Sequence, residues 1–264
     1  MVWADGRKLF RNQYRPRLHC RVILWTTIQG LGCLPRMKSD FLIFLGCLCC
    51  VSHAARRRRV CPGLRDPDYV NYSNIRRFRG CTKINGNIII TDATFHGDPY
   101  LNLMGLHPDA LRVFENVQDI TGFLVVQGKH TDFTNLSYFK SLIRIRGKKT
   151  LMNNSLTIAF TSLKYLGMTS LKTIQRGNVA IVSNKDLCYV DSIDFRKYFR
   201  RSRRQKAIVK RNKSVLNCVS EKAVCSLRCS TDGCWGPGYK NCVKKDTRFS
   251  NLIDDMLQTQ SLYT

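Results

Sequence analysis

The sequence is poor in acidic residues, and this shortage narrows its possible functions. It holds 18 Asp and Glu against 44 Lys and Arg, which gives a formal net charge of +26. A glycan-processing enzyme built on a β-solenoid would need clustered carboxylates on one strand face. The acids here are instead spread over the whole chain, so the sequence disfavours that class of enzyme.

The sequence also lacks the motifs of common catalytic sites. His96, His107 and His130 are scattered, and no serine lies in a nucleophile elbow. No glycine-rich phosphate loop precedes a helix. We therefore expect a protein that is not an enzyme, with no catalytic residues and no cofactor.

The chain has no apolar run of the roughly 18 residues that would span a bilayer. Its clearest run, Phe41 to Val51, has eleven residues and lies between Met37-Lys38 and Ser52-His53-Ala54. A charged start, a short apolar core and small residues before a cleavage position are typical of a signal peptide, which we predict over residues 37–54. The alternative is a buried segment of a longer N-terminal domain. Residues 1–36 are rich in basic residues, and their pattern does not indicate a fold.

The positive charge is concentrated in two stretches. Residues 1–60 hold twelve Lys and Arg against two acids, and Arg196 to Lys213 holds ten and no acid. A nucleic-acid-binding protein would be expected to spread its charge along a face with aromatic residues for stacking, so we expect no nucleic-acid partner. The run Arg200 to Arg204 fits a basic protease site, a site for acidic glycans or a solvated loop, and these three readings stay open.

A repeated phrase is the main structural signal in the chain. Ile120 to Val126 reads Ile-Thr-Gly-Phe-Leu-Val-Val, and related phrases begin at Ile84, Ile145 and Ile174, at spacings of 36, 25 and 29 residues. A glycine permits a tight corner, and the β-branched residues after it favour a strand. Units of this length stack and share one core. The sequence predicts a mainly β fold, a parallel β-helix or leucine-rich-like solenoid, with a β-sandwich as the alternative.

The thirteen cysteines fall into two groups. Five lie in or near the N-terminal apolar segments, and eight lie beyond them. An even set near a loop-rich C-terminus indicates disulfides and an oxidising compartment. A zinc site is disfavoured because the last four cysteines lack Cys-x2-Cys spacing and a nearby histidine. The eight are Cys61, Cys81, Cys188, Cys218, Cys225, Cys229, Cys234 and Cys242.

Four glycosylation sequons agree with secretion. We predict glycan attachment at each, because the Asn-x-Ser pattern is the acceptor for N-linked glycans in secreted proteins. The four acceptors are Asn71, Asn135, Asn153 and Asn212.

Ordered motifs along the chain resemble the receptor L domain of the epidermal growth factor receptor family. They are Asn184 to Tyr189 (Asn-Lys-Asp-Leu-Cys-Tyr), Gly233 to Pro237 (Gly-Cys-Trp-Gly-Pro), Gly86, Ile120 to Phe123 and Leu163 to Leu171. The resemblance runs from about Val60 to Cys242 and is strongest to the second L domain of the family. It implies a right-handed β-helix over residues 60–218, then the first part of a furin-like cysteine-rich module over residues 219–242. Residues 243–264 stay unassigned.

The resemblance also implies how the cysteines pair and what Trp235 does. The family's disulfides correspond to Cys61–Cys81, Cys188–Cys218, Cys225–Cys234 and Cys229–Cys242. Trp235 corresponds to a tryptophan that reaches back from the cysteine-rich module into the last turns of the solenoid. Its expected role is structural, because a large ring can seal the open end of a repeat stack.

Three ligand contacts are implied by the resemblance. Asp98 corresponds to an acidic residue that pairs with a ligand arginine, Tyr100 to an adjacent aromatic contact and Gln127 to a polar contact one turn on. A carboxylate beside an aromatic ring suits a guanidinium, through a bidentate pair and a stacking face. Asp98-Pro99 as a simple turn is the alternative. The loop from Lys148 to Asn154 is shorter than its counterpart in the family, which leaves the identity of the ligand open.

The kinase of the resembled receptors has no counterpart here, because the chain contains neither His-Arg-Asp nor Asp-Phe-Gly. The expected function is that of an extracellular growth-factor-binding domain without kinase or membrane span, acting in ligand binding or as a soluble decoy. Its expected partners are an epidermal-growth-factor-like ligand and a full-length receptor of the same family. The alternative is a secreted basic glycoprotein that binds acidic glycans.

Overall fold

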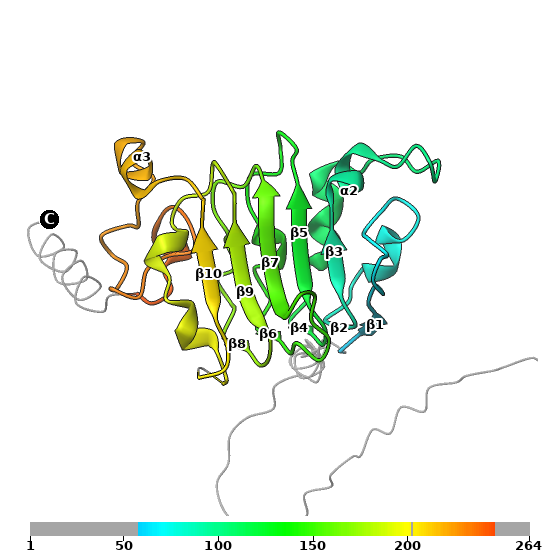
Figure 1. Ribbon diagram of the computed structural model, residues 1–264, viewed down its shortest axis with the longest axis horizontal. Coiled ribbons are helices and arrows are strands. Elements are labelled where there is room, and N and C mark those ends of the chain that lie inside the picture. Colours follow the sequence, from blue (N-terminus) through cyan, green and yellow to red (C-terminus); the bar gives the residue numbers. More distant parts are fainter. Residues whose placement is uncertain (1–57, 202, 246–264) are drawn as a thin grey trace, which may run out of the picture. The chain divides into compact units, whose positions relative to one another are not determined.

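The computed structural model describes residues 58–201 and 203–245, drawn in colour in Figure 1. The predicted signal peptide (37–54), the basic N-terminus (1–36) and most of the unassigned tail lie outside the described residues. Within the described part, no helix is long and apolar enough to cross a membrane.

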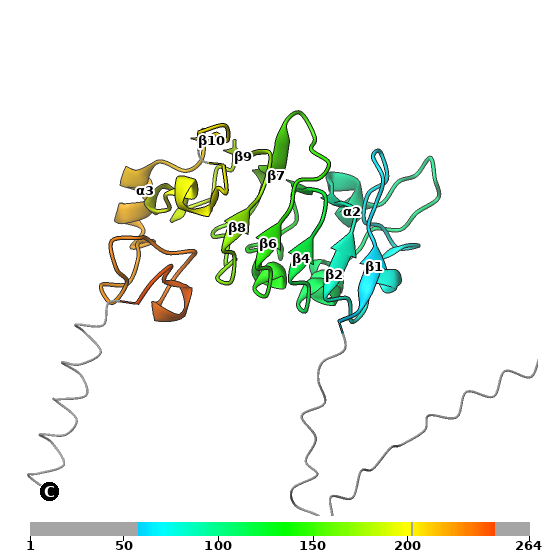
Figure 2. The ribbon, with the colours of Figure 1, turned by 90° about the horizontal axis from the view of Figure 1, so that it is seen from below.

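Two parallel sheets of five strands each form the fold. The chain alternates between them, so that strands consecutive in one sheet come from successive repeats (Figures 1 and 2). The predicted mainly β fold is confirmed, and the parallel pairing distinguishes it from an antiparallel sandwich. The first sheet has the order β1 (Val60–Pro62), β2 (Lys83–Asn85), β4 (Asp119–Ile120), β6 (Arg144–Ile145), β8 (Thr173–Ile174); the second has the order β10 (Ala207–Lys210), β9 (Asn178–Val182), β7 (Asn154–Thr161), β5 (Leu124–Gly128), β3 (Ile88–Ile90).

Short helices occupy the connections. The apolar spacing of residues 108–117 predicts a helix, and the structure has a 3-10 helix, η3, at Pro108–Phe114 with the proline in its first turn. The other helices are η2 (Ile75–Phe78), α2 (Asp92–His96), η4 (Ser137–Phe139), η5 (Val190–Ser192), η6 (Phe195–Tyr198), α3 (Val215–Ser220) and η7 (Tyr239–Asn241).

The isoleucines that open each repeated phrase form a ladder in the first sheet. Ile84 pairs with Ile120, Ile120 with Ile145, and Ile145 with Ile174. All four side chains are fully buried. The unequal spacing in sequence therefore reflects connections of different length between rungs that stay in register, and the predicted repeat is confirmed.

The corner glycines are needed for two different reasons. At Gly122, a Cβ atom would lie 1.8 Å from the Oδ1 atom of Asn87, whose side chain is 2% exposed. That oxygen accepts the backbone N–H of Phe123 at 3.3 Å, so Gly122 makes room for a buried hydrogen bond. Gly147 and Gly177 instead have positive φ angles of 59° and 75°, a conformation that side chains disfavour.

Disulfides close both ends of the repeat stack. Cys61–Cys81 joins β1 to the loop before β2, and Cys188–Cys218 joins the connection after β9 to α3. Cys225–Cys234 and Cys229–Cys242 hold the short segment that follows. These are the four pairs that the family resemblance implies.

Trp235 packs into the last turn of the solenoid. Its ring is 1% exposed and meets Phe195 and Tyr198 edge-on, with centroids 6.1 and 5.5 Å apart. Its carbonyl oxygen accepts the backbone N–H groups of Leu166 and Gly167 at 3.1 and 2.8 Å. Burial raises the pKa of Tyr198 to about 12, which keeps this phenol neutral. The cysteine-rich segment and the solenoid thus share backbone hydrogen bonds as well as apolar contacts.

Candidate ligand-binding surface

The outward side chains of the second sheet form two columns across its strands. Successive side chains of a strand point to opposite faces, and Ile88 and Ile90 are fully buried toward the core. The parallel register then places two rows on the outer face. One row is Ile89, Val125, Thr157, Ala180 and Ile208, and the other is Gln127, Ala159, Val182 and Lys210.

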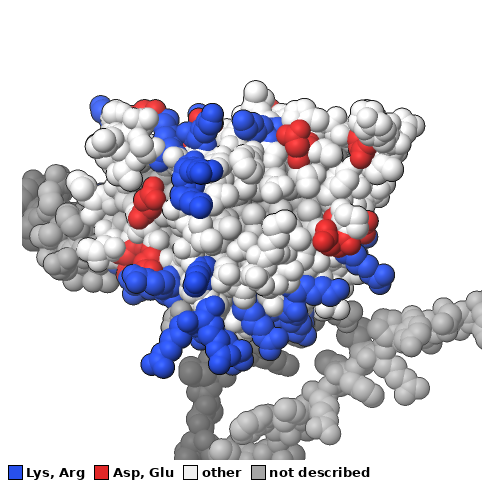
Figure 3. Space-filling view, viewed as in Figure 1, with Lys and Arg blue, Asp and Glu red and all other residues white. Residues whose placement is uncertain are grey.

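This outer face carries little charge. Lys210 is the one ionisable residue in the two rows, and the space-filling view shows a largely uncharged centre (Figure 3). Four members of the rows are nearly covered by their neighbours, since Ile89, Val125, Ala159 and Ala180 are 6%, 3%, 2% and 8% exposed. The accessible part of the rows is Gln127, Thr157, Val182, Ile208 and Lys210. Apolar surface with few charges at its centre is typical of the core of a protein–protein interface.

A short loop beside the sheet presents three apolar side chains to solvent. After α2, Asp98 and Leu103 exchange two backbone hydrogen bonds of 2.9 Å that close the loop. Tyr100 at its tip is 99% exposed, and Leu101 and Met104 are 62% and 72% exposed. Exposure of this extent has no role in packing the core, so the loop is available for a partner.

The side chain of Asp98 organises this loop. Its Oδ1 atom accepts the backbone N–H groups of Tyr100 and Leu101 at 3.0 and 3.2 Å. Its Oδ2 atom accepts the hydroxyl of Tyr69 at 3.1 Å. Asp98 therefore does form a turn, the alternative reading of Asp98-Pro99. A carboxylate has about four acceptor positions, so Oδ2 retains one for a donor from outside the chain.

Tyr69 is a site residue that the sequence does not reveal. Burial raises its pKa, and the hydrogen bond to Asp98 raises it further, so the phenol stays a donor. Tyr69 is in place because Val70 donates a backbone hydrogen bond of 2.7 Å to Ile89 in β3. No local motif marks a contact between residues 29 positions apart.

Gln127 lies at the other end of α2 from Asp98. It is in β5, partly exposed, and the next residues touch the start of α2: Lys129 donates its backbone N–H to Asp92 Oδ1 at 3.2 Å. A five-residue helix is about 7 Å long, so Asp98 and Gln127 flank one short element. Asp98 and Tyr100 are brought into direct contact, whereas no hydrogen bond among the described residues links Gln127 to either.

Phe160 adds an aromatic ring that the alternation of β7 does not predict. The register of β5 and β7 shifts between Gln127 and Gly128, where Gln127 pairs with Ala159 and Gly128 with Thr161. Phe160 is the extra residue, has a φ of 54° and is 59% exposed. A bulge of this kind re-aims a side chain, and here it leaves an aromatic ring exposed beside the last outward position of the sheet.

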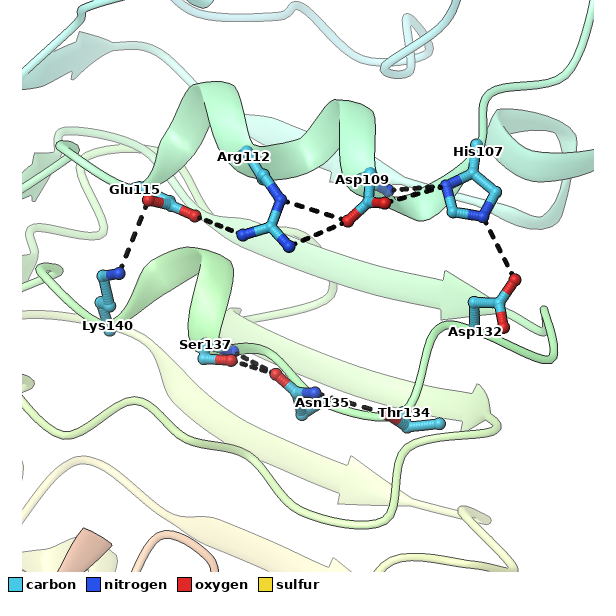
Figure 4. Close-up of polar contacts among 9 residues, drawn as sticks. All are labelled: His107, Asp109, Arg112, Glu115, Asp132, Thr134, Asn135, Ser137 and Lys140. Carbon is cyan, nitrogen blue, oxygen red and sulfur yellow. Dashed lines mark hydrogen bonds and ion pairs between the residues drawn. The ribbon is translucent and has the colours of Figure 1, made fainter. Parts of the chain in front are cut away.

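A chain of polar contacts ties two successive turns together on another side of the solenoid (Figure 4). His107 Nε2 lies 3.1 Å from Asp132 Oδ2, and Glu115 accepts from Arg112 at 3.1 Å and lies 3.5 Å from Lys140 Nζ. These exposed pairs each contribute little to stability. The part of the chain that the structure describes holds no group of three or more His, Cys, Asp or Glu that could bind a metal ion.

The four sequons differ in how accessible the acceptor nitrogen is. Asn212 Nδ2 donates to the carbonyl of Ile181 at 3.0 Å, and its Oδ1 accepts from Asn184. Asn71 Nδ2 donates to a backbone carbonyl at 3.2 Å, and Asn135 Nδ2 lies 3.4 Å from Thr134 Oγ1 (Figure 4). Asn153 is exposed in the turn before β7, which makes it the most accessible acceptor.

Comparison with known proteins places this fold. The Receptor L domain family matches residues 80–199. The chain is 39% identical over 195 residues to an epidermal growth factor receptor of Apis mellifera, covering 70% of this chain and 15% of the relative. It is 40% identical over 179 residues to the human receptor tyrosine-protein kinase erbB-4, covering 66% of this chain and 13% of the relative.

A third relative agrees with these two. The epidermal growth factor receptor of Gallus gallus is 40% identical over 176 residues, covering 66% of this chain and 25% of the relative. The chain thus spans a quarter or less of the length of these three relatives. The chain contains a receptor L domain and is related in sequence to the epidermal growth factor receptor family.

Proposed function

We propose that this chain binds an epidermal-growth-factor-like protein on the outer face of its second sheet. The loop after α2 that carries Asp98 and Tyr100, residues 97–105, forms one side of the site and is named the 97–105 loop. Tyr100 and Leu101 supply apolar anchors, Asp98 supplies an acceptor for a ligand arginine, and Gln127 supplies a polar contact. The relatives support this assignment, since two of the three are named as receptors for epidermal growth factor.

One observation carries the proposal. A flat, nearly uncharged sheet face adjoins a loop whose tip residue, Tyr100, is 99% exposed. Tyrosine is enriched among binding hot spots, and charged residues are depleted at the core of an interface. The remaining acceptor position on Asp98 favours a single hydrogen bond to a ligand guanidinium rather than a bidentate pair.

The finer assignment follows the relatives. We take residues 60–218 as the second L domain of such a receptor, coiled as a right-handed β-helix. Residues 219–242 are the start of a furin-like module. The four disulfides suit an extracellular location. A signal peptide at residues 37–54 and N-linked glycans at the sequons belong to the same proposal.

Binding is tested by isothermal titration of the purified chain with a recombinant epidermal-growth-factor-like domain. Replacing both anchors, Tyr100→Ala with Leu101→Ala, is expected to weaken binding by tenfold or more, because central apolar anchors dominate interface energetics. The matched control is Leu216→Ala with Leu227→Ala, two leucines that are 81% and 87% exposed outside this face. Equal affinities for the two double variants would exclude the proposed site.

A soluble decoy role has its own test. A chain that holds the growth factor apart from a kinase would withhold it from full-length receptors of the family. Added in excess to cells that carry such a receptor, the chain is expected to lower ligand-stimulated receptor phosphorylation. The Tyr100→Ala, Leu101→Ala variant is expected to leave phosphorylation unchanged. Phosphorylation that rises when the chain is added would contradict a decoy and indicate association with the receptor itself.

A further inference from the structure

A second surface is defined by charge rather than by apolar contact. It lies where the chain leaves β6, β8 and the next rung, Phe199, which forms an isolated parallel bridge with Ile174. Gln175 donates its backbone N–H to Ile145 O at 2.9 Å, and Arg200 donates its own to Ile174 O at 3.2 Å. Arg146, Gln175 and Arg200 therefore occupy equivalent positions on three rungs, and parallel rungs lie about 4.8 Å apart.

These corners surround one open hollow of about 700 Å³. Five of its six lining residues are cationic; the lining is Arg146, Lys148, Gln175, Arg176, Arg200 and Arg201. Figure 3 shows Lys and Arg gathered along the lower edge of the face, below its uncharged centre. We name these six residues the basic corner.

Most of this charge has no partner within the described residues. Arg146 is paired with Asp119 through its Nε atom at 2.9 and 3.0 Å. None of the ion pairs found in residues 58–201 and 203–245 involves the other four cations of the basic corner. The sequence supplies no acid between Asp132 and Asp186 and none between Asp194 and Glu221. The corner is therefore a site of uncompensated positive potential.

A buried glutamine fixes the basic loop to this corner. Gln205 is 8% exposed, and its Nε2 donates to the carbonyls of Ile174 and Gly177 at 3.2 and 2.8 Å. Its Oε1 accepts the backbone N–H of Arg201 at 2.9 Å. The backbone of Arg201 is thus held at a set position on the rungs, and its charge is available beside that of Arg176.

We propose that the basic corner binds a sulfated glycosaminoglycan chain. Cations repeated along a stack of rungs match a linear polymer with repeated sulfate groups better than a compact anion. Guanidinium groups bind such tetrahedral oxyanions with forked hydrogen bonds. The lining holds no aromatic residue on which bases could stack and no apolar residue to enter a membrane. This site is separate from the proposed growth-factor face, so one can fail without the other.

The test is retention of the full chain on immobilised heparin across a salt gradient. The variant Lys148→Gln, Arg176→Gln, Arg200→Gln removes three exposed cations. The matched control Lys164→Gln, Arg76→Gln, Arg211→Gln removes the same number and types of exposed cation elsewhere. Because polyanion binding depends on counterion release at each contact, the corner variant is expected to bind heparin at least tenfold more weakly than the wild type at ~0.15 M salt.

The control variant is expected to elute near the wild type. Equal shifts in the eluting salt concentration for both variants would mean that retention depends only on overall charge, and this would overturn the proposal. Wild-type binding to fully desulfated heparin as strong as to heparin would also overturn it, and so would equal affinity for a single-stranded oligonucleotide. Circular dichroism of both variants verifies that neither has unfolded.

Discussion

The two sheets have equal numbers of strands and different tasks. Strands of the first sheet have two or three residues, and each contributes one buried isoleucine or cysteine to a ladder. Strands of the second sheet reach eight residues and expose a flat outer face. The short rungs set the register of the repeats, while the long strands provide area for a partner. A substitution of an inward residue should therefore act on stability in either sheet, whereas one at an accessible position on the outer face of the second sheet should act on binding.

The largest difference is expected between Ile120 and Thr157. Ile120→Ala opens a cavity in the fully buried ladder and is expected to lower the free energy of unfolding by about 2–5 kcal/mol. Thr157→Ala, on the outer face of β7, is expected to change it by about 0.5 kcal/mol or less. Urea unfolding of the disulfide-intact chains measures both values. Similar losses would contradict the difference between the buried ladder and the outer face of the second sheet.

The next effect tests the corner after β4. Gly122→Ala places a methyl group against Asn87 Oδ1 and is expected to cost roughly 1–3 kcal/mol, as overpacking of a tight site does. Removing the amide should relieve the clash, so in the double variant with Asn87→Ala the two costs should not add. A double-mutant cycle by urea unfolding gives the coupling energy. Additive losses would contradict the close approach.

A charge on the second sheet should act on binding alone. Thr157→Arg places a cation at a partly exposed position of the outer row and is expected to reduce growth-factor affinity about tenfold, or about 1.4 kcal/mol. Titration calorimetry measures the affinity, and thermal unfolding verifies that stability is kept. Lys164→Ala, at an exposed position outside the two rows, is the comparison variant. Unchanged affinity in Thr157→Arg would remove the second sheet from the binding site.

The smallest effect concerns the carboxylate of Asp232, which joins the cysteine-rich segment to η6 through Lys197. Hydrogen bonds from Lys197 and Lys244 lower the pKa of Asp232 to about 2. A carboxyl with a lowered pKa stabilises the fold above its unfolded pKa of roughly 3.9 and loses that contribution as the pH falls toward 2.

Asp232→Asn is accordingly expected to reduce the melting temperature slightly at pH 6 and to flatten its fall between about pH 4 and 2. Thermal unfolding over this range measures the slope. The control is Asp191→Asn, an exposed carboxylate outside the ion pairs of the described residues. If the melting temperature of Asp232→Asn fell as steeply between about pH 4 and 2 as that of the wild type, the stabilising role of the Asp232 carboxylate would be contradicted.

The ladder was predictable because its signal is local and repeated. Four of the five strands of the first sheet carry an isoleucine with a glycine two or three residues later, and stacking repeats must align such phrases. The eight cysteines likewise pair as the family resemblance implies. The sequence pattern does not reveal why each glycine is needed. Only the folded structure shows that Gly122 leaves room for the side chain of Asn87, whereas Gly147 adopts a positive φ angle.

The candidate surfaces were less predictable because they depend on contacts distant in sequence. Tyr69 reaches Asp98 through the pairing of its segment with β3, and Phe160 is exposed by a shift in register between two strands. The run Arg200 to Arg204 is visible in the sequence, but its alignment with Lys148 and Arg176 is not. That alignment follows from which rungs become neighbours, and connection lengths alone do not determine it.

The fixed ladder with connections of unequal length has a consequence for how such a chain can change in evolution. Insertions or deletions in a connection do not change how the strands pair. The 97–105 loop can therefore be lengthened or replaced while the strands keep their register. A single residue inserted between Ile120 and Leu124 would instead turn buried side chains outward. New recognition properties can therefore arise by indels at the loops, while the rungs accept only substitutions that conserve volume.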